Sequence, residues 1–192
     1  MQTKVTKVLA LRGRRQVGCL SSTERGVLAT GAMCMSATGH FIPPMLIFPR
    51  TRLTEPLKNG ALPGTLFTCN PSGWMTITDF NIWFKHFLRH TNPSSENPVL
   101  LFLDGHASHT KNLEFLEKAA QCYVTVVSFP PHCSHKLQPL DVSFMGPLKT
   151  HFSKALENHV KSGKVATLND VSTLLGTAFM QAATTSVGIN GF

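Results

Sequence analysis

Five apolar residues run without interruption from Val99 to Leu103 and end abruptly at Asp104. Such a run is typical of a central strand that is buried on both faces by helices. A lone carboxylate inside a core is very costly, so we expect Asp104 at the C-terminal end of this strand, on the rim of the sheet. Ligands of α/β domains commonly bind at that rim. Asp104 is therefore the first candidate functional residue.

The rest of the chain predicts strands and helices in alternation. Apolar runs bounded by turn residues predict strands over 5–11, 27–36, 41–48, 99–103 and 123–129. Apolar residues at helical spacing predict helices over 80–88, 111–121, 145–156 and 168–183. In the second helix we expect Leu113, Leu116 and Ala120 to face the core. Residues 49–73 are rich in Pro and Gly and indicate a long surface connection. The pattern favours a layered α/β domain with a mixed sheet.

Composition excludes several classes of protein. The chain has 192 residues, of which 42% are hydrophobic and 15% charged, which excludes a disordered chain and allows one domain with a core. No apolar run reaches the roughly 18–20 residues of a membrane helix, and the first residues lack the apolar stretch of a secretory signal. The five cysteines are widely spaced without a C-x-x-C pair, which favours free thiols in a reducing compartment.

The positive charge is concentrated near the start. Residues 1–60 hold nine Lys or Arg and two acids, a net charge of +7 out of +8 for the chain. Such an excess favours an anionic partner, with nucleic acid first and an acidic membrane surface second. A solvated basic surface without a partner is the alternative.

A second aspartate, Asp141, follows the predicted strand over 123–129 and begins a predicted helix. Asp104 and Asp141 can therefore converge on one site. Carboxylate oxygens suit Mg²⁺ or Mn²⁺, which would activate a water or hydroxyl and stabilise the leaving oxygen in phosphodiester cleavage. Alternatively, Asp104 forms a turn and Asp141 caps a helix.

Histidines cluster in the same two segments. The cluster consists of His106, His109, His132, Cys133 and His135. Nitrogen and sulfur ligands could bind zinc, but the spacing matches no common zinc module, so hydrogen bonding around the aspartates is the favoured role. Lys136 and Lys149 flank Asp141 and could contact phosphates, or could simply be solvated.

Both aspartate segments resemble motifs of one protein family. Residues 101–109 (LFLDGHASH) resemble the second-aspartate motif of DDE transposases of the pogo/Tigger type, which include jerky proteins and centromere protein B. Residues 129–142 (FPPHCSHKLQPLDV) and 144–149 (FMGPLK) resemble the third-aspartate motif of that family. Shorter matches at 7–10, 24–26, 36–39, 42–45, 72–75 and 191–192 extend the resemblance over nearly the whole chain.

The resemblance implies a ribonuclease H-like fold and metal-dependent DNA cleavage and strand transfer. It makes Asp104 and Asp141 two of three metal-binding carboxylates, with Mg²⁺ or Mn²⁺ as cofactor and DNA as partner. His106, His109 and Lys149 would support them. The location it implies is nuclear, and a membrane partner is not expected.

The family pattern also has a first aspartate, on a central first strand that precedes the part matching residues 4–13. No acidic residue precedes Glu24 in this chain. We therefore expect residues 1–192 to form a single DDE-type domain that is truncated at both ends and lacks a helix-turn-helix region. We expect impaired catalysis, and we hypothesise that Val5–Leu11 partly covers the gap or that the chain is marginally folded. A non-catalytic interaction module or decayed remnant is the alternative function.

Overall fold

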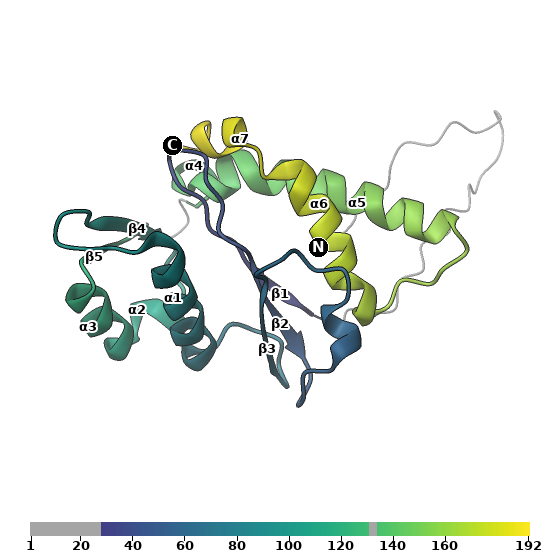
Figure 1. Ribbon diagram of the computed structural model, residues 1–192, viewed down its shortest axis with the longest axis horizontal. Coiled ribbons are helices and arrows are strands. Elements are labelled where there is room, and N and C mark those ends of the chain that lie inside the picture. The colour runs from purple at the N-terminus through teal and green to yellow at the C-terminus, as the bar shows by residue number, and fades with distance from the viewer. Residues whose placement is uncertain (1–27, 131–133) are drawn as a thin grey trace.

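The computed structural model describes residues 28–130 and 134–192, and Figure 1 shows their arrangement. Its strands are β1 (Thr30–Ala32), β2 (Met45–Pro49), β3 (Leu66–Asn70), β4 (Val99–Leu103) and β5 (Val124–Ser128). Its α-helices are α1 (Ile77–Thr91), α2 (Ala107–Thr110), α3 (Leu113–Gln121), α4 (Ser134–Leu137), α5 (Met145–Lys161), α6 (Val171–Ala182) and α7 (Thr185–Ile189). Two short 3₁₀ turns, η1 (Glu55–Lys58) and η3 (Leu168–Asp170), and one π-helical turn, η2 (Leu140–Phe144), complete it. The strand predicted over 5–11 lies outside the described residues.

The described strands form two small sheets rather than one. In the first sheet, β1 pairs antiparallel with β2, and β2 pairs parallel with β3, so that Ile47 lies opposite Thr30 and Thr68. In the second, β4 and β5 are parallel, with Leu101 opposite Val126. The predicted hairpin of 27–36 and 41–48 is confirmed in its pairing. The prediction of a long surface connection over 49–73 is wrong, because η1 and β3 lie within it and β3 is held by its pairing with β2.

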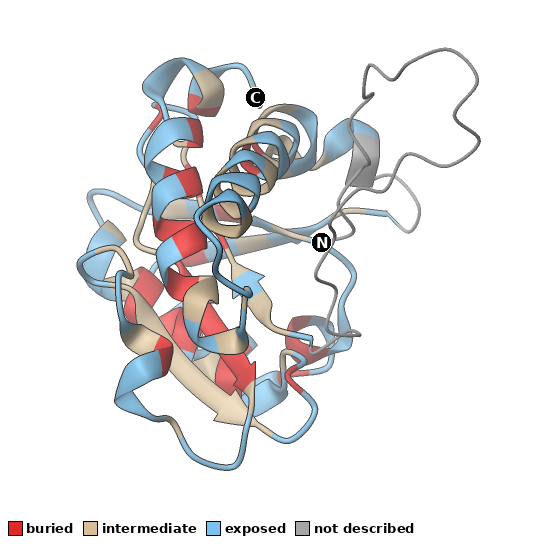
Figure 2. Cartoon of the chain, turned by 90° about the vertical axis from the view of Figure 1, so that its right-hand side faces the viewer, coloured by how far each residue is buried: buried red, intermediate tan, exposed pale blue. Residues whose placement is uncertain are grey.

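Strand β2 has helices on both of its faces. Met45 and Ile47 are fully buried and pack with aromatic residues of α1, whereas Leu46 and Phe48 pack with residues of α5 and α6 on the opposite face. Alternate side chains of a strand point to opposite faces, so β2 separates two apolar clusters. Figure 2 shows the buried residues gathered where helices meet strands.

Helix α1 begins at a complete capping box, in which Thr76 accepts a hydrogen bond from the Asp79 backbone and Asp79 accepts one from the Thr76 backbone. Its apolar stripe is buried as the sequence predicts. The stripe contacts Met45 and Ile47 of one sheet and Leu101 and Val124 of the other, all in one cluster. One helix therefore covers the same side of both sheets, which places them in a single layer.

The prediction that the strand over 99–103 is buried on both faces is wrong, and the neighbouring strand over 123–129 is also partly exposed. Leu101 is buried beneath α1, but Leu100 and Phe102 are 52% and 37% exposed, and Val127 is 39% exposed. Phe102 stacks on Phe129 with the ring centroids 5.5 Å apart. In the described part of the chain, this face of β4 and β5 carries no packed helix. Only one face of β4 is therefore buried, although its continuous apolar run predicts burial of both faces.

The residues of helix α3 that face the core also differ from those predicted. Leu113 and Leu116 are 69% and 40% exposed, and Ala120 is exposed as well. Phe115 and Ala119 are buried instead, each 1% exposed. The ring of Phe115 lies edge-on to two aromatic rings of α1, with centroid distances of 4.8 and 4.9 Å. Aromatic packing against α1 therefore decides the orientation of α3.

The C-terminal helices match their predictions. Leu148 of α5 is fully buried, and Leu175, Ala178 and Phe179 of α6 are buried against the β2 face. Thr167 and Asp170 form a capping box before α6. No helix in residues 28–130 or 134–192 is long and apolar enough to span a membrane. The described chain is thus a mixed α/β structure whose two sheets share the covering helix α1.

Candidate metal and nucleic-acid site beside Asp104

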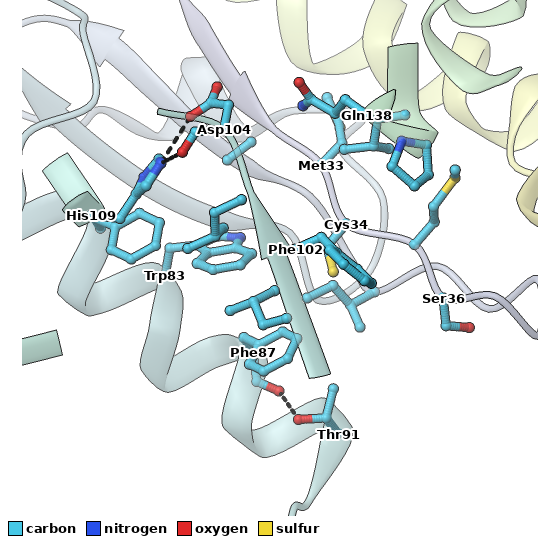
Figure 3. Close-up of a pocket in the computed structure, with 18 of the residues that line it drawn as sticks. Met33, Cys34, Ser36, Trp83, Phe87, Thr91, Phe102, Asp104, His109 and Gln138 are labelled. Atoms are coloured by element: carbon cyan, nitrogen blue, oxygen red, sulfur yellow. Dashed lines mark hydrogen bonds and ion pairs between the residues drawn. The ribbon is translucent and has the colours of Figure 1, made fainter. Parts of the chain in front are cut away.

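A groove of about 900 Å³ runs between β1 and β4 and has Asp104 at one end. One side is formed by residues 30–36 and the other by residues 99–104. Aromatic residues of α1, including Trp83 and Phe87, line it between these two sides. We call this cavity the Asp104 groove. Figure 3 shows Asp104 with His109 at one end, and Ser36 and Thr91 toward the other.

The Asp104 carboxylate is held by a histidine. The Nε2 atom of His109 lies 2.8 Å from Oδ1 of Asp104 and 2.6 Å from the Asp104 carbonyl oxygen (Figure 3). Both oxygens are acceptors, so Nε2 must carry a proton and donate it. The backbone N–H of His106 donates a further hydrogen bond to Oδ1 at 3.0 Å. These bonds set the direction of the carboxylate on the rim of β4.

A short local network in turn orients His109. Its ring is 8% exposed and packs at 4.9 Å from the ring of Phe80 on α1. The backbone N–H of Ser108 donates to Nδ1 of His106, and the Ser108 hydroxyl lies 2.9 Å from that same nitrogen. His106 thereby caps the first turn of α2, and this turn positions the ring of His109 beside the Asp104 carboxylate.

The same contacts keep Asp104 ionised. The hydrogen bond from His109 lowers the pKa of Asp104 below its ordinary value, and partial burial opposes this effect only in part. The backbone hydrogen bond from His106 lowers it further. The side chain is 49% exposed, so one oxygen of the carboxylate can face solvent or a ligand. No hydrogen bond reaches Oδ2 from the described residues, and this oxygen is available to a metal ion.

Asp141 lies in η2, at the start of the segment that continues into α5, and its side chain is exposed. The neighbouring residues Gln138 and Leu140 line the Asp104 groove, but Asp141 itself does not. Lys136 and Lys149 are exposed. The structure thus brings the two predicted motif segments to one groove without placing both carboxylates in it.

The histidine cluster, whose alternative role was zinc binding, lies partly outside the described residues. His132 and Cys133 lie outside the described residues, and the side chain of His135 is not described. Across residues 28–130 and 134–192, no three His, Cys, Asp or Glu side chains group closely enough to hold a metal ion. Of the predicted histidines, His109 contacts Asp104 directly, and His106 contacts it through its backbone.

No local pattern in the sequence marks the groove itself. Cys34 and Trp83 line it, although nothing in the sequence marks them as functional. Burial raises the pKa of the Cys34 thiol to about 12, so this cysteine is not a nucleophile at neutral pH. The indole N–H of Trp83 is buried and has no acceptor among the described residues. The apolar stripe of α1 signalled that Trp83 is buried, but not that its polar atom is unsatisfied.

Comparison with known proteins assigns the family. The chain is 29% identical over 161 residues to a protein of Cochliobolus lunatus named MFS-type transporter clz9. This match covers 82% of the chain but only 17% of that protein's length. No solved structure matches the chain. The family model described as DDE superfamily endonuclease matches residues 27–187, including both aspartate motifs. The chain therefore belongs to the DDE superfamily endonuclease family.

Proposed function

We propose that this chain is a nuclear, DNA-binding domain derived from a pogo/Tigger-type transposase, with a weakened metal site and impaired strand cleavage. Its fold in this proposal is ribonuclease H-like. The observation that carries the proposal is Asp104. Its ionised carboxylate lies at the C-terminal end of β4 and is aligned by His109, in a chain that belongs to an endonuclease family.

The residues present fit a hard divalent cation. Oδ2 of Asp104 has no hydrogen-bond partner in the described chain, and carboxylate oxygens are preferred ligands of Mg²⁺ and Mn²⁺. Asp104 would hold the ion, and Asp141, which lies outside the Asp104 groove, would have to move toward it to supply a second carboxylate. Such an ion would keep several waters and would bind substrate phosphates through its remaining positions. When bound, such an ion activates a water or hydroxyl for attack on phosphorus.

The side chains around the ion have separate roles in this proposal. His109 is a positioning residue, because it holds the direction of Asp104 and keeps it ionised. Lys149, exposed on α5, would contact a phosphate of the DNA backbone. Cleavage by the family depends on three carboxylates, whereas in the described structure Asp104 lines the Asp104 groove and Asp141 does not. We therefore expect metal and DNA binding with little turnover.

Metal binding tests the site separately from cleavage. Mn²⁺ should bind to the full chain, detected by the loss of its free electron paramagnetic resonance signal. Asp104→Ala should weaken this binding about tenfold or more, because it removes a charged ligand. Glu96→Ala, which removes an exposed acid outside the groove, should not change it. Equal Mn²⁺ binding by all three proteins would contradict the assignment of Asp104 as a ligand.

Cleavage is tested by the nicking of supercoiled plasmid in Mn²⁺. We expect the full chain to bind the plasmid but to nick it no faster than Asp104→Ala. Robust nicking that disappears in Asp104→Ala would overturn the proposed impairment and show an active nuclease. Failure to bind DNA at low salt would instead favour the non-catalytic interaction module or the decayed remnant.

A further inference from the structure

Two histidines lie one turn apart near the C-terminal end of helix α1. His86 and His90 are four residues apart, so they share one face of the helix. Their ring centroids lie 4.3 Å apart, with the ring planes inclined by 57°. His90 and Thr91 line the Asp104 groove, and Figure 3 shows Thr91 toward the end of it that is opposite Asp104. The histidine pair is therefore separate from the carboxylate site.

Backbone carbonyl groups fix the position of the proton on each ring. Nε2 of His86 lies 3.0 Å from the carbonyl oxygen of Pro43, which can only accept, so Nε2 carries the proton. Nδ1 of His90 lies 3.0 Å from the carbonyl oxygen of His86 and carries the proton for the same reason. In the neutral rings, the lone pairs therefore reside on Nδ1 of His86 and on Nε2 of His90. No donor among the described residues bonds to either of these nitrogens.

Histidines that bind metal ions have this same arrangement. A ligating imidazole binds the metal through one nitrogen and usually donates its other N–H to a carboxylate or a backbone carbonyl, which fixes the direction of the ring. Both rings of the pair have such a carbonyl partner. His86 is 6% exposed, so packing holds its ring in place, whereas His90 is exposed. An ion can therefore reach the pair from the side of His90.

We propose that His86 and His90 form a second metal site, which binds Zn²⁺ or a related late first-row divalent ion through Nδ1 of His86 and Nε2 of His90. Imidazole nitrogen suits Zn²⁺, Cu²⁺ and Ni²⁺, whereas Mg²⁺ and Mn²⁺ prefer oxygen ligands. Within residues 28–130 and 134–192, no third His, Cys, Asp or Glu joins the pair. The remaining positions of the ion are thus left to water or to an incoming ligand. The two sites of the chain would take different classes of metal ion.

A bound ion would strengthen the contact between α1 and the first sheet. The carbonyl of Pro43 that accepts from His86 lies just before β2, where Met45 is fully buried. The N–H of a metal-bound imidazole is a charge-assisted donor, which makes this hydrogen bond stronger. Arg89, the neighbouring cation on α1, is exposed, so solvent screens its repulsion of the ion. Zinc should therefore stabilise the fold by binding to the folded chain.

NMR of the full chain, labelled with ¹⁵N in its histidine rings, tests the site. Without metal, the spectra should show the Nε2–H tautomer of His86 and the Nδ1–H tautomer of His90. Zn²⁺ should shift the unprotonated nitrogen of each ring and saturate at one ion per pair. His90→Gln should weaken the zinc response of His86 about tenfold or more, because one of two ligands is lost. His40→Gln, which removes an exposed histidine of the same groove, should leave the response unchanged.

Asp104→Ala should also leave the zinc response of both rings unchanged, so that the failure of this site and the failure of the proposed site at Asp104 are distinguishable. The proposal is overturned if Zn²⁺ leaves the rings of His86 and His90 unshifted, even where it binds elsewhere in the chain. Equal losses in His90→Gln and His40→Gln, or an equal response to Mg²⁺, would overturn it as well.

Thermal unfolding gives a second measurement that does not depend on the NMR assignment. Zinc should raise the Tm of the unaltered chain more than that of His90→Gln, because only the unaltered chain offers both ligands. His90 is exposed, so this variant should fold without metal as the unaltered chain does. An equal rise of Tm in the two proteins would contradict the pair as a zinc site.

Discussion

The contact between His109 and Asp104 is the best-defined feature of the candidate site. Asp104 follows an apolar strand, and the only side-chain donor to its carboxylate among the described residues is a histidine five positions later. The intervening turn of α2 returns the chain so that the histidine lies beneath the carboxylate, packed against Phe80. A buried ring with one donor aimed at a half-exposed carboxylate is suited to align a ligand, because the ring cannot easily move away.

His109→Ala should raise the pKa of Asp104, because its largest lowering influence is the hydrogen bond from His109. The carboxyl ¹³C shift of Asp104, followed by NMR against pH and assigned with Asp104→Asn, measures this. His90→Ala removes a histidine without a contact to Asp104 and should leave the titration unchanged. An unchanged titration in His109→Ala would contradict the geometry.

The lowered pKa also predicts a pH dependence of stability. The folded pKa lies below the unfolded value of about 3.9, so the contact stabilises the fold at pH values above this. That contribution is lost as the pH falls through the lower folded pKa. The difference in unfolding free energy between the unaltered chain and His109→Ala should therefore shrink in acid. Half exposure of Asp104 keeps this effect small.

At the scale of elements, helix α1 connects the two sheets. Its aromatic stripe packs against Met45 and Ile47 on one side and against β4 and α3 on the other. Phe84 is 2% exposed and lies edge-on to Phe115 of α3 at 4.8 Å. Since the described sheets do not pair with each other, their relative placement depends on this packing.

Phe84→Ala should lower the free energy of unfolding by about 3–5 kcal/mol, the usual cost of removing a buried aromatic ring. Ile82→Ala, on the same helix but 37% exposed, should cost less than about 1 kcal/mol. Urea unfolding followed by circular dichroism measures both. Equal losses for the two variants would mean that α1 does not hold the sheets together.

At the scale of the whole molecule, most of the positive charge of residues 1–60 lies outside the described residues. Of the nine basic residues in the first sixty, six lie in residues 1–27, outside the described part. Of the three that are described, Arg50 and Arg52 are exposed, and Lys58 pairs with Glu55 at 2.7 Å. A phosphate-binding surface in this third of the chain therefore stays a prediction.

Binding to double-stranded DNA should weaken steeply with salt, with a log–log slope of about −0.9 for each phosphate neutralised. Replacement of both Arg14 and Arg15 by Ala should reduce this slope by up to about 1.8, if each contacts one phosphate. Lys161→Ala, which removes a cation paired with Glu157 at 2.6 Å on α5, should leave it unchanged. Fluorescence anisotropy at several salt concentrations gives the slopes. A slope near zero would exclude phosphate binding.

Several features could be predicted from the sequence by itself because they depend on local rules. The apolar stripe of α1, the pairing of the hairpin and the position of Asp104 at a strand end all follow from periodicity and from the cost of burying a charge. The two aspartate motifs identified the DDE endonuclease superfamily, which the match over residues 27–187 confirms.

Other features were decided only by the tertiary structure, because they depend on which surfaces meet. The inward face of α3 is set by the rings of α1, and β3 exists because β2 offers it an edge. The exposure of Phe102 reflects the absence of a helix over β4 among the described residues. The Asp104 groove and the unsatisfied Trp83 likewise arise from two strand edges that face each other, a relation between distant segments that no local pattern encodes.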